Sequence, residues 1–396
     1  MTLNPTRDWR TLLSLLPLDY ERLAVEHRLL NRQYANAKIG SAAELLRLFF
    51  VHAGTDLPLR QTVAVVGRAG GPSVSAVRLH LKMRAASPYL ATLIARLCGD
   101  ARELAPEKWG GYELVVVDAS TVSGPGADNG DARLHTVLRV ADLRPIDVKV
   151  ADARDGETLR RFVWTRTQLV IGDRGYGNGP GIAKVVDDGA DVLVRVDRGA
   201  LPLHDEDGSI DLLAWPHGGH RAIERPVQIR LWDARRHLRV VSGRLVGLRL
   251  RDEEAAEARE RVPRERGTAA SDETPEGVES VVLFTTAPAA KLSAARAVEA
   301  YRLRWQVELQ FRRWKSLCRF DRLPYYRDDT ILSWLSIKIL LGLLLDKMGS
   351  AAAELFPPAQ YAYVDRRRTV HRKAAVEACQ YSVDRRPLGA PAAGAT

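Results

Sequence analysis

The spacing of apolar positions divides the chain into a helical first part and a strand-rich second part. Up to residue 105, apolar residues recur at steps of three and four in segments that the turn signals GTDLP and GRAGGP separate. This period predicts short helices over residues 42–52, 59–66 and 73–84. The last helix carries Arg78 and Lys82 one turn apart, as in a helix-turn-helix that faces DNA. A small helical domain without any DNA contact has the same pattern.

From residue 112 the apolar pattern becomes that of strands. Short apolar runs at hairpin-like intervals predict three strands, which are followed by a helix, a strand, a helix and a strand. The predicted elements cover residues 112–118, 134–140, 147–153, 157–162, 168–173, 177–189 and 191–197 in that order. Such an order is typical of a mixed α/β layer architecture. Two of the predicted strands end in an aspartate, Asp118 and Asp173.

The next segment alternates apolar and polar side chains, which predicts half-buried antiparallel strands, and helices return after it. The predicted strands cover residues 225–233, 242–251 and 281–286, a charge-dense loop covers 251–277, and the helices cover 293–319 and 329–348. The final residues 387–396 have the composition of a disordered tail. We therefore expect a helical DNA-binding domain over residues 1–105, an α/β core over 110–200 and 291–350, a β-rich insertion over 201–290, and a basic tail over 351–396.

Composition points to a polyanionic partner. The 396 residues include 59 Lys and Arg against 49 Asp and Glu, for a net charge of +10, which favours nucleic acid as the partner. The cysteines are three in number and far apart, without a Cys-x-x-Cys pair, as is typical of a reducing compartment, so we expect a cytoplasmic location. The longest apolar run, residues 337–345, contains Lys338 and is too short to cross a bilayer. We expect no membrane partner.

The stretch YRLRWQVELQFRRWK holds a single carboxylate, Glu308, among five cationic side chains. At helical spacing Tyr301, Arg304, Glu308 and Lys315 share one face. One interpretation is an ordinary solvated helix, in which Arg304 and Glu308 form an i,i+4 charge pair. The other is a metal ligand bordered by side chains that bind phosphates.

The second interpretation depends on where the helix lies. If it brings Glu308 beside the strand-end Asp118 and Asp173, the three carboxylates need a cation to remain ionised together. Oxygen ligands suit Mg²⁺ or Mn²⁺, and a pair of such ions serves phosphoryl transfer. Cationic side chains beside the site, such as Arg304 and Lys315, would then hold the backbone of double-stranded DNA.

These motifs resemble those of the DDE transposases of bacterial insertion sequences, in the insertion sequence 4 family. The helix signature of that family is Tyr, two residues, Arg, three residues, Glu, six residues and Lys. It is matched without a gap by Tyr301, Arg304, Glu308 and Lys315. The segments VVVDASTVSGPG and VIGDRGYGN, which contain Asp118 and Asp173, are similar to the two aspartate segments of the family.

The resemblance implies an α/β fold with a ribonuclease-H-like catalytic core interrupted by a β-rich insertion. It also implies two divalent ions, cut-and-paste chemistry at inverted-repeat DNA ends, and a homodimer in the complex with those ends. In this scheme Asp118, Asp173 and Glu308 are catalytic and hold the metals, while Tyr301, Arg304 and Lys315 contact the DNA backbone. Arg174 either reaches a phosphate or fixes the rotamer of Asp173.

Further polar and aromatic residues have two interpretations each. His135 could approach the metals or be packed, and His217 and His220 suit a loop better than a zinc site. Base stacking or core packing is open to Trp232, Trp305 and Trp314, of which core packing is the safer prediction. Rival carboxylates, which we expect to be surface charges, are Asp142, Asp147, Asp152 and Asp155.

Two alternatives to a transposase use the same sequence features. A nuclease would keep the core and the metals but stop at hydrolysis, and strand-transfer products would distinguish it from a transposase. A DNA-binding inhibitor derived from a transposase would occupy element ends without cutting them. That inhibitor predicts a damaged triad, whereas all three carboxylates are present here.

Overall fold

The computed structural model describes most of the chain, from Pro5 to Leu355. The described residues are 5–30, 38–103, 108–123, 132–152, 154–196, 201–210, 212, 223–232, 237–249, 280–320, 323 and 328–355. The predicted loop at 251–277, the pair His217 and His220, and the predicted disordered tail lie outside these residues.

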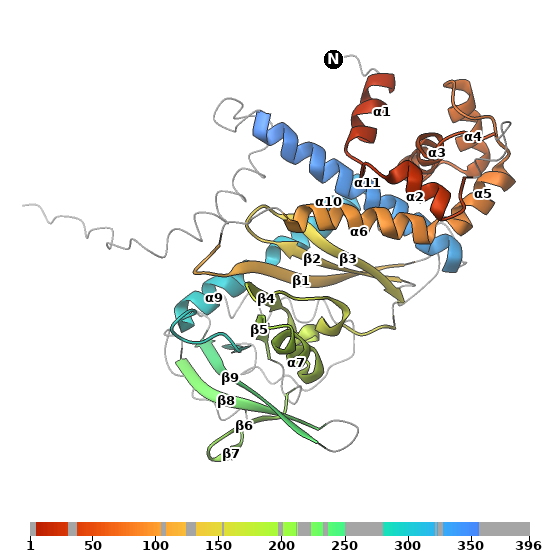
Figure 1. Ribbon diagram of the computed structural model, residues 1–396. Helices are drawn as coiled ribbons and strands as arrows, with labels where there is room; N and C mark the ends of the chain where they lie inside the picture. The colour runs from red at the N-terminus through yellow and green to blue at the C-terminus, as the bar shows by residue number, and fades with distance from the viewer. Residues whose placement is uncertain are drawn as a thin grey trace, which may run out of the picture.

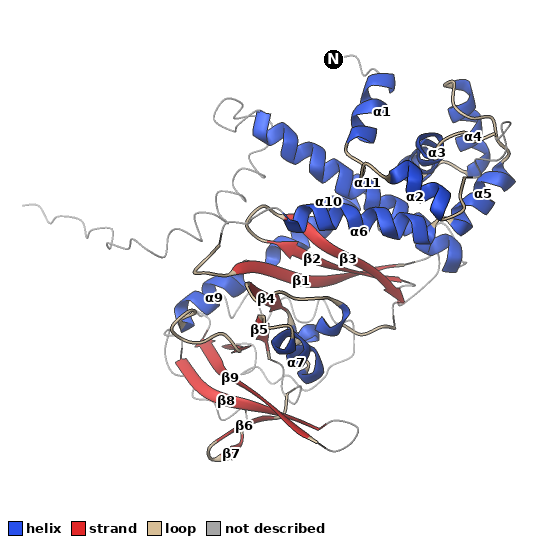
Figure 2. Cartoon of the chain, in the orientation of Figure 1, coloured by secondary structure: helices blue, strands red, loops and turns tan. Residues whose placement is uncertain are grey.

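Helices make up the first part of the chain, as the apolar period predicts (Figures 1 and 2). They are α1 (Pro5–Ser14), α2 (Tyr20–Glu26), α3 (Ala42–Thr55), α4 (Leu59–Arg68), α5 (Ala76–Ala85) and α6 (Ser87–Glu103). The Ser75 side chain accepts a hydrogen bond from the Arg78 backbone N–H, which satisfies a free donor at the helix end. For that reason α5 begins at Ala76, three residues later than the predicted helix.

Among the described residues, ten strands form one mixed sheet in the order β3-β2-β1-β4-β5-β10-β9-β8-β6-β7. The first five are β1 (Glu113–Val122), β2 (Ala132–Arg139), β3 (Arg144–Asp152), β4 (Gln168–Gly172) and β5 (Asp191–Arg195). The others are β6 (Leu203–Asp205), β7 (Gly208–Ser209), β8 (Ile223–Trp232), β9 (Leu238–Arg249) and β10 (Ser280–Thr285). Strands β1, β4 and β5 are parallel, whereas β10 pairs with β5 in the antiparallel sense. The β-rich segment therefore extends the sheet of the core.

Helices cover the two faces of the part of this sheet that β1 to β5 form (Figure 2). They are α7 (Gly179–Asp187), α9 (Ala294–Arg302), α10 (Trp305–Cys318) and α11 (Asp328–Leu355), with short 3₁₀ turns η1 (Leu159–Arg161) and η2 (Arg174–Tyr176). Alternate residues of β1 enter different cores, as strand geometry requires. Leu114 and Val116 belong to the core that contains the N-terminal helices and α11, whereas Val115 and Val117 face the core of α7.

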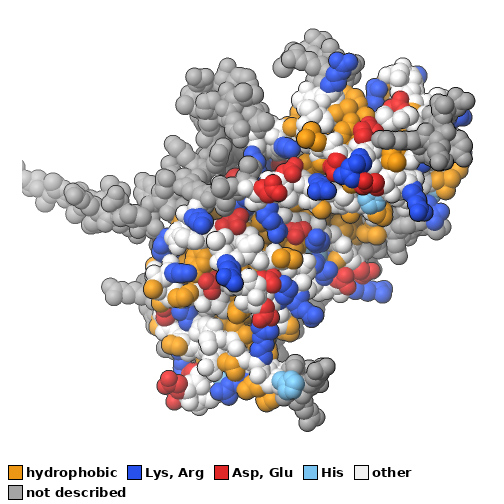
Figure 3. All heavy atoms as spheres, viewed as in Figure 1, with side chains coloured by type: hydrophobic (Ala, Val, Ile, Leu, Met, Phe, Trp, Pro, Cys, Tyr) orange, Lys and Arg blue, Asp and Glu red, His pale blue; other side chains and the backbone are white. Residues whose placement is uncertain are grey.

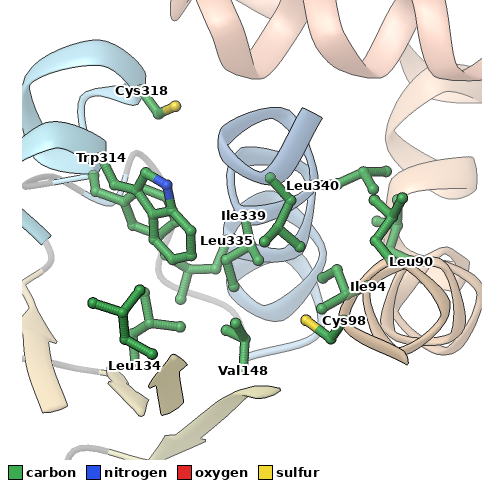
Figure 4. Close-up of a cluster of buried hydrophobic side chains, with 14 of the residues drawn as sticks. Leu90, Ile94, Cys98, Leu134, Val148, Trp314, Cys318, Leu335, Ile339 and Leu340 are labelled. Carbon is green, nitrogen blue, oxygen red and sulfur yellow. The ribbon is translucent and has the colours of Figure 1, made fainter. Parts of the chain in front are cut away.

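Helix α11 is the element that joins the N-terminal helices to the sheet. It contacts α3, α5, α6, α10 and β3. In Figure 4, Leu335, Ile339 and Leu340 of α11 lie between α6 and the Trp314 ring of α10, above the strands. One contiguous hydrophobic cluster therefore spans the first hundred residues and the sheet. The same view shows Cys98 and Cys318, which are buried and free.

A charged side chain lies in the middle of this apolar helix. Lys338 is fully buried, and its Nζ donates to Asp56 Oδ1 at 2.8 Å and to the Arg319 carbonyl at 3.0 Å. The ammonium also lies 4.0 Å from the centre of the Trp334 ring. Since a buried charge is costly unless it is paired, these contacts tie α11 to the end of α3 and to the end of α10. Of the helices that the structure describes, none has the length and apolar character to cross a membrane.

Lys338 is buried and Asp56 is partly exposed, so we expect substitution of the two residues to lower the free energy of unfolding by different amounts. Asp56→Asn leaves a fully buried ammonium without its carboxylate, and we expect the free energy of unfolding to fall by about 3 kcal/mol. Lys338→Met leaves a carboxylate that is 32% exposed and still 3.6 Å from Arg319, so we expect a loss of about 1 kcal/mol. Urea denaturation of both variants measures the difference, and a larger loss in Lys338→Met would contradict this account.

Candidate active site

The pairing of β1 with β4 brings the two predicted aspartates together. In their parallel register Val117 lies beside Gly172, so the next residues, Asp118 and Asp173, come level. Both point to the sheet face that α10 covers, because alternate side chains share a face with Val116. The prediction that both aspartates end a strand is wrong for Asp118. Strand β1 continues to Val122 because β2 still pairs with it there, and only β4 ends before its aspartate.

The predicted helix 293–319 is divided into α9 and α10 at Leu303 and Arg304. The backbone N–H groups of these two residues bond to the carbonyls three positions back, at 3.0 Å each. This is the 3₁₀ pattern, in which side chains three residues apart are eclipsed. Tyr301 and Arg304 therefore lie one above the other, and both reach the ends of the strands.

The Arg304 guanidinium lies between the three carboxylates. Its Nη2 is 2.8 Å from Glu308 Oε1, and its Nη1 is 3.7 Å from Asp173 Oδ2 and 3.9 Å from Asp118 Oδ2. The Tyr301 hydroxyl donates to the other oxygen of Asp173 at 3.0 Å. The sheet edge and the helix thus bring Asp118, Asp173 and Glu308 together, as the second interpretation of the sequence requires.

Burial and neighbouring charges give the two aspartates different proton affinities. Burial raises the pKa of Asp118 to about 7, against a hydrogen bond from Ala119 N–H and the charge of Arg304. Burial acts in the same direction on Asp173, but Arg304, the Arg174 N–H and the Tyr301 hydroxyl together lower its pKa below the ordinary value. Burial also disfavours the charge of Arg304, yet the carboxylates of Asp173, Glu308 and Asp118 raise its pKa.

The donor set suits a hard divalent ion, since three carboxylates offer only oxygen ligands. As the side chains are placed, no three His, Cys, Asp or Glu groups among the described residues are gathered around one ion position. A cation is nonetheless already at the centre of the carboxylates, in the form of the Arg304 guanidinium. The donor chemistry therefore suits a divalent ion, and metal binding by these three carboxylates stays a prediction.

Comparison with known proteins agrees with this geometry. A sequence profile described as the transposase DDE domain matches residues 109–344, which contain all three carboxylates. The chain is 30% identical over 329 residues to the putative transposase InsL for insertion sequence element IS186A of Escherichia coli (strain K12), a match that covers 81% of this chain and 88% of the relative. It is also 30% identical over 330 residues to the transposase for insertion sequence element IS421 of Escherichia coli, with the same coverage.

The chain belongs to the DDE transposase family. The cationic residues predicted to bind DNA in this DDE protein differ in where they lie and in what they contact. Arg174 donates its backbone N–H to Asp173 Oδ1 at 2.8 Å. Lys315 is exposed, near the far end of α10 from the carboxylates. On α5, Arg78 is exposed, whereas Lys82 donates to the Leu29 carbonyl in the helical part. The Lys82 ammonium thus has an acceptor within the protein, and a contact of Lys82 with DNA stays a prediction.

The remaining candidates lie outside the triad. His135 is fully buried, with its Nδ1 2.9 Å from the Tyr176 hydroxyl, so it is packed between elements. Trp314 is also in the core, but the prediction of core packing is wrong for Trp232, which is 68% exposed on β8, and for Trp305, which is 37% exposed at the start of α10. Among the rival carboxylates, Asp142 is paired with the buried Arg139 at 2.6 Å and is not a simple surface charge.

Sequence reasoning missed two residues that border the site. Glu157 lies against the loop after Asp173, where a Cβ on Gly175 would come within 1.8 Å of its carboxylate. Its charge acts on Asp118 and on Asp173. Arg195 ends β5, the strand beside β4, and helps to lower the pKa of Asp173. Arg195 could have been identified if the pairing of β5 with β4 had been known. No motif around Glu157 marks it as a residue of the site.

The raised pKa of Asp118 predicts a pH dependence of stability in the metal-free protein. Its contribution is fully present below the unfolded value of 3.8 and is lost as the pH rises through about 7, since the unfolded chain releases the proton first. We expect the free energy of unfolding to fall by about 4 kcal/mol across this window. Asp173 acts in the opposite sense, and its contribution is lost on acidification.

Denaturation in EDTA across this pH range measures the effect. Asp118→Asn should remove the decline, whereas Asp152→Asn, at an exposed carboxylate, should leave it as in the wild type. The same decline in Asp118→Asn would assign it to another group.

Proposed function

We propose that this chain is a transposase that cuts the ends of an insertion sequence and joins them to target DNA by metal-dependent phosphoryl transfer. The observation that carries the proposal is the meeting of Asp118, Asp173 and Glu308 around one guanidinium at a sheet edge. The family profile and the two curated relatives, each named as a transposase of an insertion sequence, support it. The spacing of Tyr301, Arg304 and Glu308 supports the insertion sequence 4 family in particular.

The catalytic core is proposed to be ribonuclease-H-like. In support, the order β3-β2-β1-β4-β5 combines an antiparallel meander with parallel β1, β4 and β5. Parallel strands present their carboxyl ends at the same edge, where ligands of α/β sheets bind. Asp173 follows the end of β4 at that edge, Asp118 lies level with it within β1, and the helix after the β-rich segment supplies Glu308.

Each residue of the site has a distinct task in this scheme. Asp118, Asp173 and Glu308 would hold two divalent ions, Mg²⁺ or Mn²⁺, which activate the attacking oxygen and stabilise the leaving oxygen. Tyr301 orients Asp173 by donating its hydroxyl to Oδ1, which would leave Oδ2 to hold a metal ion. Arg195 and Arg174 neighbour the second aspartate, and in this scheme they would hold a phosphate of the DNA backbone.

Recognition of the DNA end is proposed to lie on α5. Its outward face carries Val77 and Leu81, which are 69% and 55% exposed, beside the exposed Arg78. An arginine can read guanine in the major groove, and branched apolar side chains can contact thymine methyl groups. The molecular face in Figure 3 mixes Lys and Arg with Asp and Glu side chains, so charge alone does not mark a DNA path there. Two inverted-repeat ends call for two copies of the chain, and we propose a homodimer.

A nuclease that stops at hydrolysis is the second candidate, because the same carboxylates would perform the first cut. The intact triad disfavours a non-cutting inhibitor. Incubating the protein with its own element's end DNA, a target plasmid and Mg²⁺ distinguishes these functions. Joined products support a transposase, cut ends alone support a nuclease, and binding without cuts supports an inhibitor.

Removal of any triad carboxylate should abolish the chemistry and leave DNA binding in place. We expect Asp118→Asn, Asp173→Asn and Glu308→Gln each to reduce end cleavage by more than about a thousandfold, since each removes a ligand of the ions. Gel-based cleavage assays and gel-shift assays on the same samples measure both properties. The matched control is Asp152→Asn on the same sheet. A variant that still cleaves near the wild-type rate would remove its residue from the site.

The two predicted cations of α5 should behave differently. Arg78→Ala should weaken binding of end DNA and reduce its preference over random DNA by about 1–3 kcal/mol, with little effect on stability. Lys82→Ala should leave that preference unchanged and lower the melting temperature, because it removes the contact with Leu29. Competition binding and thermal denaturation test both. Loss of preference in Lys82→Ala, with none in Arg78→Ala, would contradict the assignment.

A further inference from the structure

The position of Arg304 raises the question of what happens when a divalent ion arrives. The guanidinium lies within 3.9 Å of Asp118, 3.7 Å of Asp173 and 2.8 Å of Glu308. A divalent ion held by the same oxygens would be in the immediate neighbourhood of this positive charge. Because like charges repel strongly at such distances in a partly buried site, the guanidinium and the ions compete for one position.

We infer that Arg304 is a built-in counter-ion, which holds the three carboxylates together in the free protein and leaves them for a DNA phosphate when divalent ions bind. This inference rests on the proposed function. It makes Arg304 a positioning residue whose two states link DNA binding to metal binding. From the sequence, Arg304 is assigned either a charge pair with Glu308 or a contact with a DNA phosphate.

The contacts of Arg304 are suited to such an exchange. The contact with Glu308 is short, but both aspartates lie beyond hydrogen-bond distance of the guanidinium. Charge, more than directional bonding, therefore holds the side chain over the strands. Arg304 belongs to the 3₁₀ turn between α9 and α10, so its side chain can change rotamer while the backbone of both helices stays in place.

The solvent side of the site offers a place for the guanidinium to go. Glu308 and Asp173 are 40% and 36% exposed, whereas Arg304 and Asp118 are 20% and 17% exposed. The guanidinium thus has the less exposed Asp118 on one side and an open side toward Glu308 and Asp173. A phosphate there would receive two parallel N–H bonds from the planar fork of arginine. The negative charge of the phosphate would take the place of the aspartate charges that the guanidinium no longer contacts.

Thermodynamic linkage makes the inference measurable. If DNA attracts the guanidinium and thereby frees the carboxylates, DNA must tighten metal binding, and metal must tighten DNA binding by the same factor. Without Arg304, DNA binding should no longer change the affinity for metal. The competing account is that Arg304 stays on the carboxylates in every state and only fixes the fold of the helix junction.

The test is Mn²⁺ binding by the full chain, followed through the electron paramagnetic resonance signal of free Mn²⁺, with and without a short mixed-sequence duplex. We expect Arg304→Gln to bind Mn²⁺ at least about tenfold more tightly than the wild type without DNA. The duplex should tighten Mn²⁺ binding by a similar factor in the wild type and have little effect in Arg304→Gln. Arg302→Gln, at an exposed arginine of α9, is the matched control and should behave as the wild type.

The outcomes separate this inference from the proposed function. If Asp173→Asn and Glu308→Gln retain full Mn²⁺ affinity, the metal site itself is wrong. If they lose it but Arg304→Gln binds Mn²⁺ no more tightly than the wild type, the counter-ion role is overturned and the site stands. Should Arg304→Gln fail to fold, the wild-type measurement decides: equal Mn²⁺ affinity with and without the duplex overturns the inference.

Discussion

Three carboxylates at one end of a sheet repel one another, so the site can exist in the folded chain only with positive charge or protons among them. The structure uses both means. Arg304 places its guanidinium between the carboxylates, and burial holds the pKa of Asp118 at about 7. The 3₁₀ turn between α9 and α10, the parallel register of β1 and β4, and the hydroxyl of Tyr301 all serve to keep this arrangement of charge in place.

The parts of the fold that depend on local pattern could be predicted from the sequence. The apolar runs of β1 and β4 and the helical period around Glu308 identify the triad because each signal lies within a few residues. Contacts between distant segments are different. The end of β1 could not be placed, since the pairing with β2 that extends it past Asp118 is a tertiary contact. Glu157 precedes the three-residue turn η1, where the pattern predicts a helix over residues 157–162, and that pattern does not show that its carboxylate lies beside Asp173.

The direction of side chains was the property of the candidate site that the sequence predicted least well. Lys82 and Arg78 are one turn apart in the sequence, yet only Arg78 is exposed, because the ammonium of Lys82 finds a carbonyl acceptor at Leu29. Trp232 is exposed although an aromatic residue is expected in a core, because it lies on the outward face of a long hairpin. Spacing places such residues on a helix or a strand, but their partners decide what they contact.

The shared core around α11 has a consequence for how transposases of this kind can diversify. The N-terminal helices lie on the same helix that packs against the sheet and against α10 (Figure 4), and Lys338 fastens them there. Exchange of the first hundred residues between relatives would pair a foreign surface with α11 and break that packing. If α5 reads the DNA end, as proposed, new end specificities should arise by substitution on its outer face, residue by residue, and not by shuffling of an independent module.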